Sequence, residues 1–120
     1  MSSNMDPNSI AEHVDMDTLN MLKEIMEDGF SALLETYISD SEVRVNELRE
    51  SLAAGDSETV RRSAHSLKGS SGNLGANQMA ALCLHVEDSA KEERLDGLDV
   101  EVEKISSEYQ AVKAIMQSLL

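Results

Sequence analysis

Apolar side chains in residues 98–119 recur at alternating steps of four and three residues. They are Leu98, Val102, Ile105, Tyr109, Val112, Met116 and Leu119. This spacing places all seven on one narrow face of an α-helix. A helix with a single apolar seam needs partner helices at a shallow angle, as in an antiparallel bundle.

The composition agrees with a helical fold. Aromatic residues make up only 2% of the 120 residues, and there is one proline. The core must therefore be built from Leu, Ile, Val, Met and Ala, a mixture that favours helices over strands. A chain of this length can bury a sizeable core without disulfides or metal, so we expect one all-α domain.

Start and stop signals divide the rest of the chain into four further predicted helices. Asp17 is the predicted N-cap of the first, and either Asp56 or Ser57 caps the third. The four are expected at residues 17–28, 30–54, 57–74 and 77–94. Residues 1–12 are small and polar, and we expect them to form a flexible tail.

The formal net charge of -13 makes the surface repel other anions. Binding of nucleic acid or of an anionic membrane is therefore not expected, and the partner should be another protein. Cys83 is the single cysteine, and no apolar run is long enough to cross a bilayer. We expect no signal peptide, because the first residues lack a basic stretch followed by an apolar one. We expect a soluble, cytoplasmic protein.

Residues 69–77 give two conflicting signals. Their composition predicts a loop, because each glycine inside a helix costs about 1 kcal/mol relative to alanine. The apolar register predicts a helix, because Leu74 continues the face formed by Ala64 and Leu67. The residues alone leave both conformations open.

His65 lies on the side of the predicted helix opposite this apolar face, so its ring should face solvent. Lys68 and Gly69 follow it by three and four residues, and Gly72 by seven, so all three lie beside it. The two glycines would leave a strip of bare backbone that another protein could approach closely.

The stretch around His65 lacks acidic residues in a strongly acidic chain. Residues 59–86 contain no Asp or Glu, although the chain has 23 of them, and they do contain Arg61, Arg62 and Lys68. An acid-poor face around one histidine is usually coincidental. Here it agrees with the exposed ring and the glycine strip, and together these features indicate a functional site.

The region from residue 65 to residue 75 resembles the histidine phosphotransfer (HPt) domain of bacterial and fungal phosphorelays. The matching residues are His65-Ser66-Leu67-Lys68-Gly69, Gly72 and Leu74-Gly75. Residues 14–56 are also similar to this family. The resemblance implies an antiparallel up-and-down four-helix bundle with an additional short N-terminal helix, and a histidine helix that continues through the glycines. It implies an HPt domain over residues 13–120, after a tail at 1–12.

The resemblance also implies a chemistry. His65 would accept a phosphoryl group from the phospho-aspartate of a hybrid sensor kinase's receiver domain and pass it to a response regulator's receiver domain. Lys68 would neutralise charge on the phosphoryl oxygens. Residues expected to dock the receivers are Arg61, Arg62, Gly69 and Gly72. Because no Gly-rich nucleotide loop is present, we expect a phosphoryl carrier and not an enzyme. We also expect a monomer, with no cofactor and no metal.

The family often has a polar residue, commonly glutamine, near the phosphorylated histidine, and Glu87 occupies that position here. A carboxylate could accept a hydrogen bond from the ring and fix its tautomer. It would also repel a phosphoryl group. Both orientations of Glu87, toward His65 and away from it, remain open.

Two other interpretations compete. Cys83, His85 and Glu87 alternate along a helix, a pattern that scatters ligands around the helix and disfavours a metal site. The stronger rival is a small acidic chaperone or adaptor that binds a partner without phosphotransfer. Charge and composition suit that class equally well, but they do not account for the Lys68, Gly69 and Gly72 register beside His65.

Overall fold

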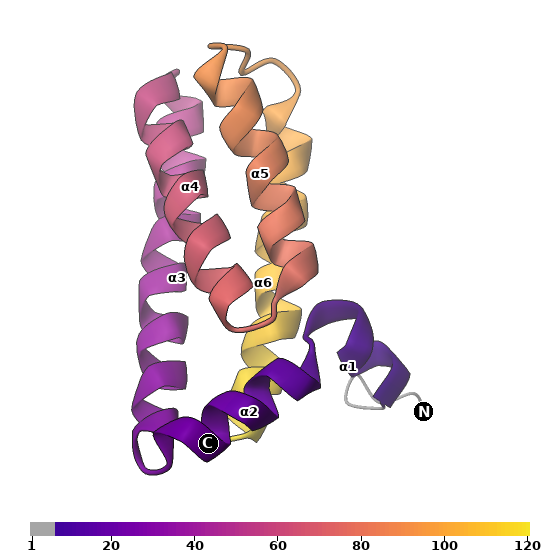
Figure 1. Ribbon diagram of the computed structural model, residues 1–120. Helices are drawn as coiled ribbons and strands as arrows, with labels where there is room; N and C mark the ends of the chain where they lie inside the picture. The colour runs from indigo at the N-terminus through magenta and orange to yellow at the C-terminus, as the bar shows by residue number, and fades with distance from the viewer. Residues whose placement is uncertain (1–6) are drawn as a thin grey trace.

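The computed structural model describes residues 7–120, with side-chain surroundings from residue 10 onward, and its regular elements are all helices (Figure 1). They are α1 (Pro7–His13), α2 (Met16–Met26), α3 (Gly29–Ala53), α4 (Ser57–Asn73), α5 (Asn77–Lys91) and α6 (Leu98–Ser118). Helices α3 to α6 run up and down as an antiparallel bundle, and α2 lies across one end of it. The predicted all-α four-helix bundle is confirmed.

The core lies between the apolar faces of the four long helices. The predicted seam of α6 is buried from Leu98 to Met116, and Leu119 is half-buried. Burial of these apolar side chains, few of which are aromatic, is the main source of stability for α6. No helix in the part of the chain that the structure describes is both long and apolar enough to span a membrane.

Helix α4 starts at the predicted N-cap. The carboxylate of Asp56 accepts hydrogen bonds from the backbone N–H of Thr59 at 3.1 Å and from the Thr59 hydroxyl at 2.6 Å. Such a cap satisfies a donor that the helix itself cannot pair. It fixes the register in which every later residue of α4 is presented.

The helix continues through Gly69 and Gly72, so the loop prediction is wrong for residues 69–73. Tertiary packing explains why. Leu67 and Ser71 are fully buried, and the Ser71 hydroxyl is 2.8 Å from the Tyr37 hydroxyl of α3 in a buried hydrogen bond. These contacts offset the low helix propensity of the glycines.

Gly75 lies outside the helix, contrary to the family-based prediction of a helix through all three glycines. Its φ of +81° belongs to the left-handed region that glycine adopts without strain. Its carbonyl accepts a hydrogen bond from the backbone N–H of Asp15 at 2.9 Å. The turn from α4 into α5 is therefore closed against the start of α2.

The N-terminal region differs from the prediction of a flexible tail over residues 1–12. Residues 1–6 lie outside the described part, but Pro7–His13 forms the helix α1. Ile10 packs against the core, and His13 Nδ1 is within 2.9 Å of both carboxylate oxygens of the buried Glu108. One apolar contact and one polar contact thus hold a segment whose composition alone indicated a tail.

Two helix boundaries also differ. The N-cap of α2 is Asp15, not Asp17, since the Asp15 carboxylate accepts hydrogen bonds from the Asp17 backbone at 3.0 Å and from the Thr18 hydroxyl at 3.1 Å. Helix α5 ends at Lys91, three residues before the predicted end at Arg94. Glu93, with a φ of +59°, lies in the left-handed region and continues no helix.

We predict that Gly75→Ala lowers the free energy of unfolding by about 2–4 kcal/mol. A Cβ there meets the backbone oxygen of Asp15 at 3.0 Å, in addition to the strain of a positive φ. Gly97→Ala is the matched control, because its φ is also +81° while its Cβ would enter open space. It should cost only about 1–2 kcal/mol. Urea denaturation measures both, and equal losses would contradict the packing argument.

Candidate functional site

His65 lies in the middle of α4 with its side chain pointing out of the bundle. Its side chain is 63% exposed, whereas Ala64 and Leu67 on either side of it are fully buried. The predicted division of α4 into a core face and a histidine face is thus what the structure shows. The ring is open to a protein that approaches from solvent.

Glu87 of α5 points toward His65, which settles the two orientations left open by the sequence. Its Oε2 is 2.8 Å from Nδ1 of His65. Because a carboxylate only accepts hydrogen bonds, the neutral ring donates Nδ1–H, and the other ring nitrogen, Nε2, keeps its lone pair. The contact therefore favours the tautomer in which Nε2 carries the free lone pair.

Lys68 contacts the same carboxylate on its other side. Its Nζ lies 2.8 Å from Oε1 of Glu87 in an ion pair. Glu87 is only 13% exposed, so this pair is screened by water less than an ion pair on the open surface. One carboxylate thus joins the two α4 residues that lie one turn apart.

The pKa of Glu87 reflects these two partners. Partial burial acts to raise the pKa, but the contacts with Lys68 and then His65 outweigh burial, and the pKa lies below the usual value for a glutamate. Glu87 is therefore charged at neutral pH. It accepts a hydrogen bond from the ring and forms an ion pair with the ammonium of Lys68.

The two glycines beside the ring have different surroundings. A Cβ added at Gly69 would have no neighbour within 4 Å, whereas one at Gly72 would come within 3.9 Å of the Ala80 Cβ on α5. Gly69 therefore leaves the surface beside His65 bare. Gly72 lies where α4 and α5 approach each other just before the turn that joins them.

Arg61 and Arg62 both lie next to acidic side chains. Arg61 is paired with Glu58 on its own helix, with N–O distances of 2.8 and 3.0 Å. Arg62 lines a shallow polar groove between α3 and α4, with Glu47 among the other lining residues. Residues 59–86 do lack acidic residues, but two of their three cations pair with acids just outside that stretch. Arg61 pairs with Glu58, and Lys68 pairs with Glu87.

Leu84 is a feature that the sequence analysis missed. It lies one turn before Glu87 on α5, and it is 44% exposed despite being a large apolar residue. The signal was present, since Leu84 falls between the inward positions Cys83 and Val86 and so off the apolar register. An exposed leucine on this face of α5 adds apolar surface near the histidine.

The other candidate residues lie elsewhere. Cys83 is buried, and burial raises the pKa of its thiol to about 12, so it is an inert core residue. His85 is exposed on α5, and Glu87 faces His65, so the Cys83, His85 and Glu87 set does not converge. Among residues 10–120, no cluster of metal-ligating side chains is present.

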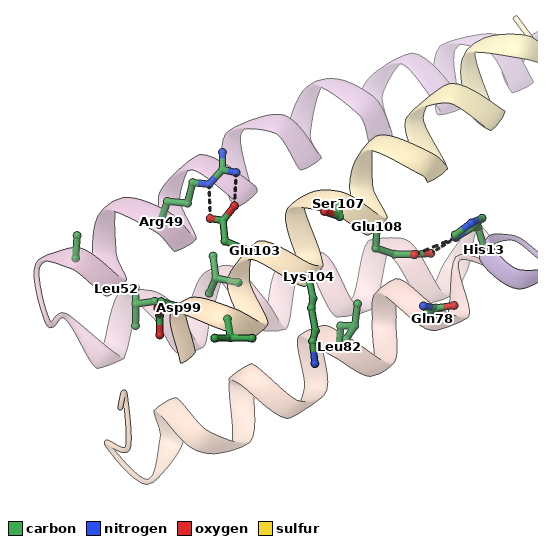
Figure 2. A pocket seen from close by; sticks show the side chains of 13 residues that line it. His13, Arg49, Leu52, Gln78, Leu82, Asp99, Glu103, Lys104, Ser107 and Glu108 are labelled. Atoms are coloured by element: carbon green, nitrogen blue, oxygen red, sulfur yellow. Dashed lines mark hydrogen bonds and ion pairs between the residues drawn. The ribbon is translucent and has the colours of Figure 1, made fainter. Parts of the chain in front are cut away.

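A groove of about 1110 Å³ lies along α6 and away from His65 (Figure 2). Its walls come from α1, α3, α5 and α6, and they include the Arg49–Glu103 and His13–Glu108 pairs. Acidic and basic side chains surround an apolar floor that is open to solvent. The groove is separate from the histidine site, which is a surface on α4 and α5.

Comparison with known proteins shows which family the chain belongs to. Residues 32–115 match the Hpt domain family. The chain belongs to this family. It is 37% identical to histidine-containing phosphotransfer protein B from Pseudomonas aeruginosa PAO1, with a TM-score of 0.86 over 88% of this chain and 92% of that one. HPt proteins are phosphoryl carriers without a kinase domain, so the chain has a histidine phosphotransfer role in a phosphorelay.

Two more distant relatives extend the comparison. Histidine-containing phosphotransfer protein 2 of Arabidopsis thaliana is 26% identical, over 86% of this chain and 70% of its own length. The HPT domain of a sensor hybrid histidine kinase from Shewanella is 18% identical, with a TM-score of 0.78 over 92% of this chain and 95% of that one. The second likeness shows that the fold is shared at low identity.

Proposed function

We propose that His65 is the residue that carries the phosphoryl group. The observation that supports this is the hydrogen bond from Nδ1–H to Glu87 on a ring that is 63% exposed. That bond leaves the lone pair of Nε2 in solvent, where an electrophilic phosphorus can reach it. His13 is half-buried against Glu108, and the exposed His85 has no carboxylate partner in the described part of the chain, so neither has the same arrangement.

The transfer is an exchange between His65 and an aspartyl phosphate. The Nε2 lone pair forms a bond to phosphorus while the P–O bond to the aspartyl carboxyl breaks, and its electron pair leaves on that carboxylate. Passing the group on is the same exchange in reverse with a second aspartate. We propose the receiver domain of a hybrid sensor kinase as donor and that of a response regulator as acceptor.

Lys68 is proposed to stabilise charge on the phosphoryl oxygens. Its Nζ is held one helical turn from the ring by Oε1 of Glu87. A phosphoryl group on Nε2 offers the ammonium a more highly charged partner at short range. Lys68 would then exchange a carboxylate oxygen for a phosphoryl oxygen without moving along the chain.

The docking surface is proposed to centre on the bare backbone at Gly69. Gly72 and the exposed Leu84 would extend it along α4 and α5, and Arg62 would border it on the α3 side. Arg61 is the weaker candidate, because Glu58 already pairs with it. An adaptor that only binds a partner would need no hydrogen bond from the ring to Glu87, so this rival is not favoured.

We predict that His65→Gln abolishes phosphoryl transfer. Purified protein incubated with a phosphorylated receiver domain should acquire acid-labile, base-stable phosphate, and the variant should acquire none because it lacks the nucleophile. His85→Gln, which removes an exposed histidine from α5, is the matched control and should label as the wild type does. Labelling of His65→Gln at the wild-type level would overturn the assignment.

We predict that Lys68→Ala slows transfer by roughly 10-fold or more while the fold stays intact, because it removes one cation from the developing charge. Stopped-flow measurement of transfer gives the rate, and circular dichroism the fold. Lys104→Ala removes the same charge from an exposed position on α6 and should transfer at the wild-type rate. Equal rates for Lys68→Ala and wild type would remove Lys68 from the mechanism.

We predict that Gly69→Gln slows transfer by roughly 10-fold or more without loss of stability. The side chain would enter open space on the isolated protein, and leaving glycine gains about 0.5–1 kcal/mol of helix propensity. Ser70→Gln adds the same side chain to a neighbouring exposed position that is turned away from the ring. Thermal denaturation and transfer rates separate the two properties, and equally slow transfer in both variants would contradict docking at Gly69.

A further inference from the structure

Glu87 does more than a hydrogen-bond acceptor beside His65 needs to do. A neutral amide at this position could accept the Nδ1–H bond equally well. The structure instead holds a carboxylate, mostly buried, with one oxygen on the ring and the other on Lys68. Burying a charge costs free energy, so the presence of a charged side chain at this position needs an explanation.

The ring changes its charge during the transfer. A neutral imidazole that uses the Nε2 lone pair to bond phosphorus, and keeps its proton on Nδ1, becomes a cationic phosphoimidazolium. The charges balance: a neutral ring and an aspartyl phosphate of charge −2 give a phosphorylated ring of charge −1 and a carboxylate of charge −1. The carboxylate of Glu87 lies 2.8 Å from the nitrogen that carries this proton.

The Nδ1 proton decides how easily the phosphoryl group leaves again. With the proton in place, the P–N bond breaks to release a neutral imidazole. Without it, the ring has to leave as an imidazolate, which is a much poorer leaving group. A negative charge next to Nδ1–H favours the protonated ring.

We propose that the charge of Glu87 keeps the proton on Nδ1 of phosphorylated His65, so that the protein holds its phosphoryl group in the readily transferred phosphoimidazolium form. Glu87 is then a positioning residue that acts through the ring. This inference rests on the proposed role of His65 as the phosphoryl carrier. It adds the group that determines how easily the P–N bond of phosphorylated His65 breaks.

The charged and titratable groups around this proton come from two helices. Arg61 and Lys68 of α4 both interact with Glu87, and they oppose its effect on the ring. Cys83 of α5 also interacts with Glu87, but it stays a neutral thiol because burial raises its pKa to about 12. Glu87 is the group in hydrogen-bond contact with Nδ1, so its charge dominates.

The test is the titration of phosphorylated His65 in Glu87→Gln. Potassium phosphoramidate can phosphorylate the ring chemically, so no receiver domain is needed, and NMR of the 15N-labelled ring follows Nδ1 from pH 5 to 10. We expect the ring of Glu87→Gln to lose its proton about one pH unit lower than that of the wild type, a 10-fold weaker proton affinity. At pH 9, phosphate should leave the variant about 10-fold more slowly.

Asp88→Asn is the matched control, because it removes the same charge from the adjacent exposed position on α5. It should titrate as the wild type does. Equal titration of Glu87→Gln and wild type, or an equal shift in Glu87→Gln and Asp88→Asn, would overturn the proposal. Absence of exchange with every receiver domain would count against the proposed function and leave this titration unaffected.

Lys68→Met gives a second variant with the opposite sign. Whether it pairs with Glu87 or with the phosphoryl oxygens, the Lys68 ammonium is a positive charge close to the ring, so without it the phosphorylated ring should hold its proton to a higher pH than in the wild type. A shift to lower pH would contradict a role for the carboxylate charge. Because Lys68 is half-buried at the surface, this substitution should not disturb the core.

Discussion

The burial of one face of α4 is the constraint on which the site depends. Val60, Ala64, Leu67 and Ser71 are all fully buried, so the rotation of the helix about its own axis is fixed. His65 then has only one direction in which to point, which is outward. Leu67 and Ser71 also hold the helix together through glycines that local propensity would place in a loop. The exposed position of the imidazole is therefore a consequence of core packing.

The turn between α4 and α5 transmits this constraint to Glu87. A side chain on α5 can reach a ring on α4 only if the two helices are close and in register. Gly72 and Ala80 permit the close approach, and Gly75 makes the tight turn that fixes the register while its carbonyl bonds to the start of α2. Gly75, which has no side chain, thus helps to set the 2.8 Å contact between His65 and Glu87.

The sequence predicted the features that depend on the periodicity of apolar residues. It did not predict the features that depend on polar contacts between residues far apart in the chain. The helix spans, the core face of α4 and the exposure of His65 all follow from apolar spacing. The order of residues 7–13 does not, because it depends on a pair between His13 and Glu108, which are 95 positions apart. Local charge counts likewise described a basic window, since they could not show that Arg61 and Lys68 pair with acids at its edges.

These ion pairs change how an acidic protein can receive an anion. With a formal charge of -13 and its nearest cation paired, the site offers little net attraction at long range. For the proposed docking of a receiver domain, recognition then has to come from short-range fit to the glycine strip and nearby apolar surface. In the proposed transfer, Lys68 exchanges the Glu87 carboxylate for phosphoryl oxygens, while Glu87 gains a cationic ring in place of the ammonium. Each charge keeps a partner throughout the exchange, so neither step leaves a partly buried ion uncompensated.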